Sequence, residues 1–333
     1  MKVLFIGGTG NISTAVSTLA IQQGIDLYLL TRGQSDRILK GATYMNADVS
    51  LDNLSKVLKG QQWDCVVNWI AFHESDVNRD IQLFEGRTGQ YVFISSASVY
   101  QKPPPHPVIT ESTPISNPFW EYARNKIACE TRLHQAHREQ DFPMTIVRPS
   151  HTYDTVIPLA LGGFREYTAV DRMKKGKKII VHGDGTSLWT ITHSEDFAKG
   201  FIGLLGNQPA IGQVFHITSD EVLTWNQLTE MVGDAIGIKP HLIHIPSEFI
   251  VKFIPEAYGS LMGDKSFSAV FDNSKIKQYV PDFKATIPFR EGIRKTMEWF
   301  ESKPERQRIN SELDILMDQV IKLYESAYCG VLK

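Results

Sequence analysis

The chain has 333 residues, 42% of them hydrophobic and 22% charged, with a formal net charge of −2 at pH 7. This length predicts a large domain with a smaller partner, and the near-neutral charge excludes a strong overall attraction to nucleic acid. Cys65, Cys129 and Cys329 are odd in number and lack metal-ligand spacing, so we expect no disulfide framework, no metal site and a cytoplasmic protein. No apolar run reaches membrane-spanning length.

Short apolar runs alternate with helical patterns in the first half of the chain. The runs predict strands at 3–6, 27–30, 44–47, 65–70, 91–94 and 144–147. The helical patterns predict helices at 12–20, 51–58 and 118–139. In the last of these, Asn117 is expected to cap the helix and Pro118 to begin it. Such alternation predicts an α/β fold built on a doubly wound parallel Rossmann sheet.

The alternation becomes irregular beyond residue 154, which predicts a second and smaller layer. We expect a dinucleotide-binding domain at 1–154, joined in its sheet by segments near 189–218, and mainly a substrate-binding domain at 155–300. Within the irregular part, strands are expected near 179–181 and 214–217, and a helix near 225–236.

Two features of the C-terminal half leave alternatives open. An apolar stripe at helical spacing predicts an appended helix within 301–333, which packs on the core or on a second chain; the stripe consists of Leu313, Met317, Ile321 and Tyr324. The basic run 172–178 is expected to be a solvated surface or a site for the phosphates of a substrate or of RNA.

A glycine-rich segment directly follows the first predicted strand. It reads Gly7-Gly8-Thr9-Gly10-Asn11-Ile12-Ser13 and leads into an amphipathic helix. Glycine allows a tight turn there and lets a phosphate approach backbone amides at the helix N-terminus, and the flanking strand and helix give the motif its specificity. We therefore predict that a dinucleotide cofactor binds at Gly7, Thr9, Gly10, Asn11 and Ile12.

The residues at the end of the second predicted strand indicate which dinucleotide the protein uses. NAD-preferring proteins place an acid there to bind the ribose 2′-hydroxyl, whereas this chain has Thr31-Arg32-Gly33 and then Arg37. Charge-assisted hydrogen bonds from arginine suit a 2′-phosphate. We therefore expect cofactor contacts at Thr31, Arg32 and Arg37 and favour NADP over NAD, the alternative being that Arg32 lies on the surface.

Three polar residues form the expected catalytic group. Tyr122 and Lys126 are four residues apart on one predicted helix and therefore share a face. A tyrosine with a pKa near ~10 is a poor base at neutral pH, and a nearby cation favours its phenolate. Ser96 follows the fifth strand, at the sheet edge where ligands of open α/β folds bind, and its hydroxyl can hydrogen-bond a reacting oxygen.

The order of these motifs resembles the extended short-chain dehydrogenase/reductase family, which contains nucleotide-sugar epimerases, dehydratases and reductases. The glycine loop comes first, then Ser96 before Val99-Tyr100, then Tyr122 and Lys126. The resemblance extends over roughly residues 1 to 300. It implies that Tyr122 moves a proton, Ser96 polarises the substrate oxygen and Lys126 holds the nicotinamide ribose. Further cofactor contacts are implied at Asp48, Val49, Ala71, Tyr122, Lys126 and Pro149.

The resemblance also implies a substrate class and a homodimer. Hydride transfer to or from a sugar-like alcohol or ketone is expected, by an epimerase or a reductase, with substrate contacts at Ser98, His151 and Trp189. Many nucleotide-sugar enzymes of the family have an arginine on the substrate diphosphate where this chain has Trp189, which puts a nucleotide-linked substrate in doubt. Family dimers often form through the tyrosine-bearing helix; here such a face would include Ala128, Leu133 and Ala136.

A second class of function remains as the alternative. The opening of the chain also resembles the chloroplast stem-loop RNA-binding proteins, which are relatives of the epimerases. The same fold would then serve a non-catalytic dinucleotide-sensing or RNA-binding protein. The intact set of Ser96, Tyr122 and Lys126 favours redox chemistry on a small molecule.

Overall fold

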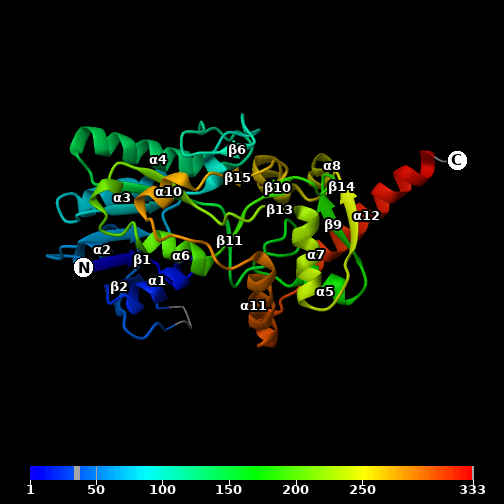
Figure 1. The fold of residues 1–333 in the computed structure, drawn as a ribbon, viewed down its shortest axis with the longest axis horizontal. Coiled ribbons are helices and arrows are strands. Elements are labelled where there is room, and N and C mark those ends of the chain that lie inside the picture. The colour runs from blue at the N-terminus through cyan, green and yellow to red at the C-terminus, as the bar shows by residue number, and fades with distance from the viewer. Residues whose placement is uncertain (34–37, 50, 332–333) are drawn as a thin grey trace.

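A seven-stranded parallel sheet forms the larger part of the molecule (Figure 1). The structure is a computed structural model that describes residues 1–33, 38–49 and 51–331. The strand order is β3-β2-β1-β4-β5-β7-β12, which confirms the predicted α/β fold and doubly wound parallel sheet. The strands are β1 Lys2–Ile6, β2 Asp26–Thr31, β3 Thr43–Asn46, β4 Cys65–Asn68, β5 Tyr91–Ile94, β7 Met144–Pro149 and β12 Val214–Ile217.

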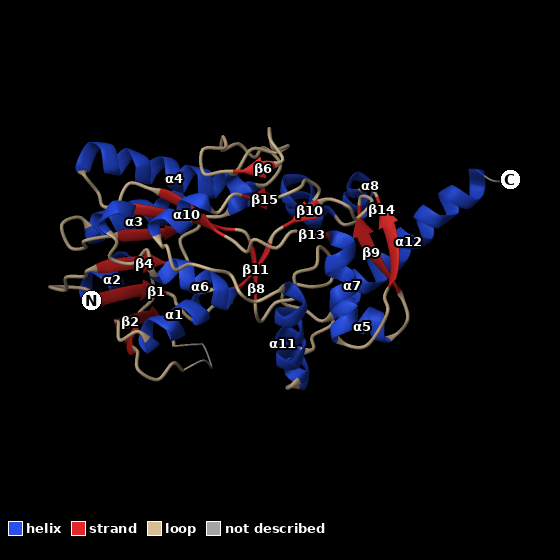
Figure 2. Ribbon diagram, in the orientation of Figure 1, coloured by secondary structure: helices blue, strands red, loops and turns tan. Residues whose placement is uncertain are grey.

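Helices cover both faces of this sheet (Figure 2). One apolar core lies between the sheet and the helices α1 (Ser13–Gln22) and α6 (Ser194–Ile202). A second core lies on the opposite face, beneath α2 (Leu51–Val57), α3 (Glu74–Phe84) and α4 (Glu121–Gln140). Central strands buried on both faces need continuous apolar runs, which is why the sequence pattern identified them.

Helix α4 begins three residues later than expected. Asn117 does not cap it: its Nδ2 atom donates to the carbonyl oxygens of Ser98, at 2.7 Å, and Gly263, at 2.6 Å. Trp120 takes the N-cap position instead. Leu133 and Ala136 of α4 are fully buried against the sheet, so the prediction that they belong to a dimer face is wrong.

A smaller part of the molecule packs against the carboxyl edge of the sheet. Its main strands, β9 (Lys178–His182) and β14 (His241–Ile245), pair in parallel. Its larger helices are α5 Thr168–Lys174, α7 Trp225–Ala235, α8 Ser247–Phe253 and α11 Phe289–Glu301. Shorter strands connect the two parts: β6 Val108–Ile109, β8 His151–Tyr153, β10 Leu188–Trp189, β11 Ile191–His193, β13 Leu223–Thr224 and β15 Val270–Phe271. The shorter helices include α9 Tyr258–Ser260, η4 Leu261–Lys265 and α10 Ser274–Tyr279.

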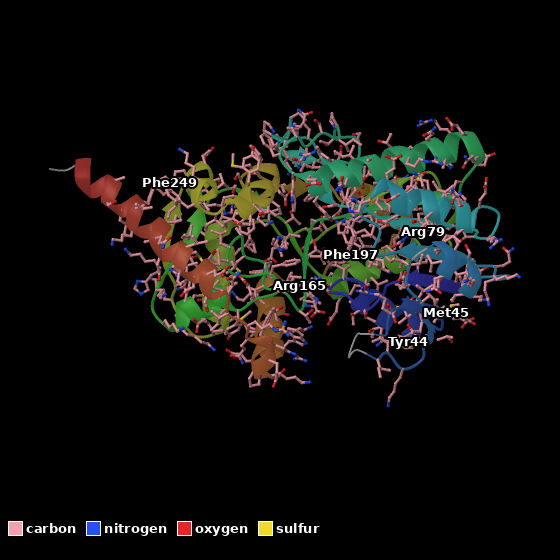
Figure 3. The ribbon with its side chains drawn as sticks, turned by 180° about the vertical axis from the view of Figure 1, so that it is seen from behind. Tyr44, Met45, Arg79, Arg165, Phe197 and Phe249 are labelled. Atoms are coloured by element: carbon pink, nitrogen blue, oxygen red, sulfur yellow. The ribbon has the colours of Figure 1, made fainter. Side chains whose placement is uncertain are left out.

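The C-terminal helix α12 (Ser311–Val331) packs on the smaller part of its own chain. Met317 and Ile321 of the predicted stripe are buried, together with Val320. The centroid of the Tyr324 ring lies 5.5 Å from that of Phe249 on α8. Figure 3 shows Phe249 beside α12. Core packing is therefore one role of this helix. In the part of the chain that is described, no helix has the length and apolar composition to cross a membrane.

The acidic face of α12 neutralises much of the basic run 172–178. Arg172 pairs with Asp314 at 2.5 Å and with Asp318 at 2.9 Å, and Lys177 pairs with the same two carboxylates. Other lysines of the run pair with Glu301, Asp171 and Glu325. The run is therefore an intramolecular ion-pair network rather than a free basic patch.

A buried ion pair holds α4 on the sheet. Arg148, on β7, donates from Nε and Nη2 to the two carboxylate oxygens of Glu130, at 2.9 and 2.5 Å. Ser95, at the end of β5, donates to the same carboxylate. The Glu130 side chain has no exposed surface, so water does not reach its carboxylate.

We expect Glu130→Gln to lower the free energy of unfolding by about 3–5 kcal/mol, because it leaves the Arg148 guanidinium buried without its countercharge. Urea denaturation followed by circular dichroism measures the change. Glu139→Gln, at the exposed end of the same helix, is the control and should change stability little. Equal effects of the two substitutions would contradict the assigned role of the pair.

Candidate functional site

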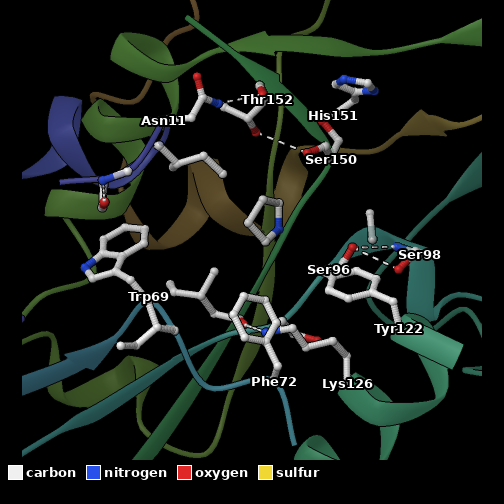
Figure 4. Close-up of a pocket in the computed structure, with 18 of the residues that line it drawn as sticks. Asn11, Trp69, Phe72, Ser96, Ser98, Tyr122, Lys126, Ser150, His151 and Thr152 are labelled. Atoms are coloured by element: carbon white, nitrogen blue, oxygen red, sulfur yellow. Dashed lines mark hydrogen bonds between the residues drawn. The ribbon is translucent and has the colours of Figure 1, made fainter. Parts of the chain in front are cut away.

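One cavity of about 1270 Å³ lies at the carboxyl ends of the sheet strands. It is larger than the roughly 300–1,000 Å³ of a typical single-ligand pocket, which leaves room for a dinucleotide and a second molecule. Ser96, Ser98, Tyr122 and Lys126 lie on one side of it, and Asn11 and Trp69 on the other (Figure 4). Residues from β10 and η4 of the smaller part close the remaining wall.

The glycine loop forms one end of the cavity. Gly7 and Gly8 have φ values of +95° and +110°, which side chains rarely adopt, and a Cβ on Gly8 would lie 2.7 Å from the Leu29 side chain. The amide of Gly10 donates to Ser13 Oγ at 2.8 Å. The Ser13 side chain therefore restrains the loop. Thr9 and Ile12 line the cavity as well.

Asn11 has a structural use that the sequence motif did not reveal. Its Nδ2 atom donates to the Thr152 carbonyl oxygen at 3.0 Å, and its Oδ1 atom accepts from the Thr155 amide at 3.1 Å. The side chain thus ties the glycine loop to β8 and the turn after it. A cofactor contact at Asn11 would have to come mainly from its backbone.

The expected adenosine contacts line the neighbouring part of the cavity. Thr31 and Arg32 follow β2, and Asp48 and Val49 follow β3. The Arg32 side chain is exposed at the edge of the cavity, a position that fits both the binding of a 2′-phosphate and the surface alternative. Arg37 lies outside the described residues.

The wall after β4 differs from the prediction. Ala71 is buried, with 1% of its surface exposed, and does not line the cavity. Its neighbours Ile70 and Phe72 line it instead, with 42% and 44% of their surfaces exposed. Ala71 contributes through its carbonyl oxygen, which accepts a hydrogen bond from Lys126 Nζ at 2.6 Å. The expected contact of its side chain with a cofactor is therefore wrong.

Ser96, Ser98 and Tyr122 form a hydrogen-bonded group. Ser96 Oγ accepts from the Ser98 hydroxyl at 2.9 Å and from the Ser98 amide at 3.2 Å. Because Ser96 accepts both bonds, its own proton remains available to Tyr122 or to a substrate oxygen. Burial raises the pKa of Tyr122 above its ordinary value, and a hydrogen bond with Ser96 opposes that shift. The phenol is therefore protonated at neutral pH in this state.

Lys126 lies deeper in the site than the phenol. Its Nζ atom donates to the carbonyl oxygens of Ala71, at 2.6 Å, and Ile94, at 2.7 Å. The Phe72 ring covers the ammonium at 4.5 Å, and the centroid of the Tyr122 ring is 5.8 Å away. Burial lowers the pKa of Lys126 to about 8. These contacts hold the cation near the phenol but not in direct contact with it.

Pro149, His151 and Trp189 line the cavity where the two parts of the molecule meet. Trp189 is 2% exposed, and its indole nitrogen donates to the Phe267 carbonyl oxygen at 2.8 Å. The one hydrogen-bond donor of the Trp189 side chain is therefore already used within the protein. The Nε2 atom of His151 is buried and has no hydrogen-bond partner among the described residues.

Several cavity residues carry no recognisable sequence motif. The most prominent are Trp69, Phe72, Lys102, Trp120, Asp264 and Lys265. Lys102 follows the short helix η1 (Ala97–Val99) and Lys265 ends η4, so they come from distant parts of the chain. In the sequence, neither lysine differs from the many that lie on surfaces. Within the described ranges, no three His, Cys, Asp or Glu side chains are grouped as a metal ion would require.

His151 should remain uncharged throughout the physiological pH range. Burial, and after it the charge of Lys265, lowers its pKa to about 3, so the neutral imidazole persists above about pH 4. Nitrogen NMR of histidine-labelled protein should show one ring, missing from His151→Gln, that does not titrate between pH 5 and 8. A midpoint inside that interval would show that the ring is more accessible to solvent than the structure indicates.

Comparison with known sequences identifies a family and several distant relatives. Residues 3–217 match the sequence model of the NAD dependent epimerase/dehydratase family. The chain is 28% identical to the chloroplast stem-loop binding protein of 41 kDa b from Arabidopsis thaliana, over 74% of this chain and 67% of that protein. It is 22% identical to the 2′-dehydrokanamycin reductase of Streptomyces kanamyceticus, over 85% of this chain and 80% of the reductase.

Solved structures share the fold over nearly the whole chain. An epimerase from Methanothermobacter thermautotrophicus has a TM-score of 0.73 and 17% identity, covering 91% of this chain and 93% of that one. The UDP-glucuronic acid 4-epimerase of Bacillus cereus, solved with UDP-glucuronic acid and NAD, has a TM-score of 0.72 and 18% identity, covering 91% and 99%. These findings confirm the resemblances to extended short-chain dehydrogenases and to the stem-loop binding proteins. Because the family match spans well over half of the chain, the protein belongs to the NAD dependent epimerase/dehydratase family.

Proposed function

We propose that the protein is an NAD(P)-dependent oxidoreductase or epimerase that acts on a sugar-like alcohol or ketone. The observation that carries this proposal is the grouping of Ser96, Tyr122 and Lys126 in one cavity with the glycine loop. Family membership supports an enzyme of the epimerase/dehydratase type that uses a nicotinamide dinucleotide. In this proposal the smaller part of the molecule is the substrate-binding domain.

The residues present fit a dinucleotide. The positive φ values of Gly7 and Gly8 turn the chain sharply into α1, so that loop amides can meet a pyrophosphate at a helix N-terminus. Thr31, Arg32, Asp48 and Val49 would surround the adenosine, and Pro149 would lie beneath the nicotinamide. When bound, the nicotinamide supplies the hydride acceptor or donor.

The chain's own residues would manage the proton. Tyr122 takes the hydroxyl proton of the substrate in oxidation and returns it in reduction. Ser96 donates a hydrogen bond to the same substrate oxygen, while Ser98 keeps the Ser96 hydroxyl oriented. Lys126 binds the nicotinamide ribose, and the positive charges near Tyr122 lower its raised pKa when the oxidised dinucleotide is present.

Two forms of this chemistry remain within the proposal. A reductase releases its oxidised cofactor after each turnover, whereas an epimerase regenerates the cofactor within one. Arg32, which lines the cavity just after β2 where NAD-preferring proteins place an acid, favours NADP, and a separately supplied NADPH suits a reductase. We further propose that the protein is cytoplasmic and that it forms a homodimer. The Ala128 side of α4 is available for a dimer contact, whereas Leu133 and Ala136 are buried within the chain.

The non-catalytic RNA-binding alternative keeps one supporting fact, the likeness to a stem-loop binding protein. The basic run 172–178 offers it little support, because acidic residues of α12 and α11 pair with most of its charges. Affinity for RNA depends on basic side chains that are free to neutralise phosphates. The small-molecule proposal is therefore preferred.

Replacing Tyr122 by Phe removes the proposed acid/base while keeping the ring. We expect Tyr122→Phe to reduce redox turnover by about 10²- to 10⁴-fold and to leave dinucleotide affinity nearly unchanged. Steady-state kinetics and fluorescence titration with the cofactor measure the two effects. Tyr258→Phe, at an exposed tyrosine outside the cavity, is the matched control. Retained turnover in Tyr122→Phe would exclude this tyrosine as the proton-transfer residue.

The cofactor itself can be identified by denaturing purified protein and analysing the released dinucleotide. We expect little retained NAD(H), and preferential binding of added NADPH over NADH. Arg32→Ala should weaken NADPH binding by about 10- to 100-fold, since one charge-assisted contact is lost, and spare NADH binding. Arg294→Ala, on the exposed face of α11, should change neither affinity. Tightly retained NAD(H) would contradict the role of Arg32 and favour the epimerase.

A further inference from the structure

Two buried lysines share one carboxylate in the wall of the cavity. Lys102 Nζ lies 3.5 Å from Asp264 Oδ1, and Lys265 Nζ lies 3.8 Å from Asp264 Oδ2. Only 1% of the Lys102 side chain and 10% of the Lys265 side chain are exposed. All three residues line the cavity.

This cluster has a positive charge that the protein does not neutralise. Both separations exceed the about 2.7–2.9 Å of a charge-assisted hydrogen bond. In the described part of the chain, no other oxygen accepts a hydrogen bond from either ammonium. Lysines are almost never buried unless they are paired, so two ammonium groups on one carboxylate leave one charge and several donors for a ligand.

The described lining of the cavity is also net positive. Among the residues that the structure describes, two side chains of the lining are acidic, Asp48 and Asp264. Five are basic: Arg32, Lys102, Lys126, Arg165 and Lys265. Arg32 lies at the adenosine end, Lys126 lies next to the Tyr122 ring, and Arg165 is exposed. Lys102 and Lys265 are buried and are not among the expected cofactor contacts, so we assign them to the substrate half of the cavity. The His151 imidazole beside them is neutral and adds no charge.

The lysine pair is close to the reacting group. Trp120 adjoins both Tyr122 and Lys265. The centroid of the Trp120 ring lies 5.0 Å from the centroid of the Tyr122 ring and 5.9 Å from Lys265 Nζ. The Asn117 side chain binds both the Ser98 and Gly263 carbonyl oxygens. It therefore ties the segment carrying Lys265 to the loop carrying Ser96. Asp264 is near enough that its charge raises the pKa of Tyr122.

We propose that Lys102 and Lys265 bind an anionic group, a carboxylate or a phosphate monoester, on the substrate's own carbon skeleton. Lys265 and Tyr122 both adjoin the Trp120 ring, which favours an anion on the part of the substrate that reacts over one at the distant end of a nucleotide. Trp189, whose one donor is occupied, offers no charge to a nucleotide diphosphate. This inference rests on the proposed function for the role of Tyr122, but the anion site itself is independent of turnover.

The test measures binding of three sugars to protein saturated with its dinucleotide. D-Glucuronate carries a carboxylate, D-glucose 6-phosphate carries a phosphate monoester, and D-glucose is the neutral match. Isothermal titration of the wild-type protein should show at least tenfold tighter binding for one of the anionic sugars than for glucose. Which anion binds more tightly distinguishes the carboxylate from the phosphate. Equal binding of all three sugars, or no binding of either anion, would overturn the proposal.

Substitutions then assign the preference to the two lysines. Lys102→Met and Lys265→Met keep the length of the side chain and remove its charge; each should lower affinity for the preferred anion at least tenfold and leave affinity for glucose unchanged. Lys252→Met, at an exposed lysine of α8, should have no effect. Survival of the preference in both cavity variants would overturn the assignment.

Cofactor binding separates this proposal from the proposed function. Each lysine variant should retain its dinucleotide affinity, which also shows that it is folded. The sugar titrations are therefore repeated without added dinucleotide. A preference for anionic sugars in protein that binds no dinucleotide would contradict the proposed function and keep the anion site. A protein that binds the dinucleotide but does not prefer anionic sugars would contradict the anion site and leave the proposed function standing.

Discussion

The buried pair between Glu130 and Arg148 is the interaction on which the site depends. It joins α4 to β7, and Ser95 extends the contact to β5. Glu130 lies one helical turn beyond Lys126 and two beyond Tyr122, on the same face of α4. A shift of this anchor would move the phenol and the ammonium together relative to Ser96. The main effect of the ion pair is to hold α4 in one position on the sheet, and its net contribution to the free energy of folding is secondary.

The sheet and the principal motifs could be predicted because they depend on local patterns. Apolar runs such as 91–94 and 144–147 mark strands buried on both faces, and the glycines at 7 and 8 are required by positive φ values. Helix α3 has no counterpart among the predicted elements. Its sequence is rich in polar and charged residues, and only one face is apolar, formed by Val77, Ile81, Leu83 and Phe84.

What sequence reasoning missed depends on contacts between distant segments. Lys102 and Lys265 meet only because the second part of the chain folds back over the sheet edge, and neither carries a local signature. The same cause explains the corrections. Asn117 was expected as a helix cap but links two distant segments of the chain. Trp189 was expected to contact a substrate, but its one donor binds the Phe267 carbonyl oxygen.

The buried cations of the cavity bear on which ligand it binds. Burial lowers the pKa values of Lys126 and Lys265, which means that the folded chain pays a desolvation cost to keep each of them charged. An anion bound at Lys265 would reduce that cost and would therefore stabilise the folded protein in proportion to its affinity. Asp264 does not neutralise the charges of both Lys102 and Lys265, and the remaining positive charge predicts an anionic substrate. The fold alone would not predict this, because one fold can bind many substrates.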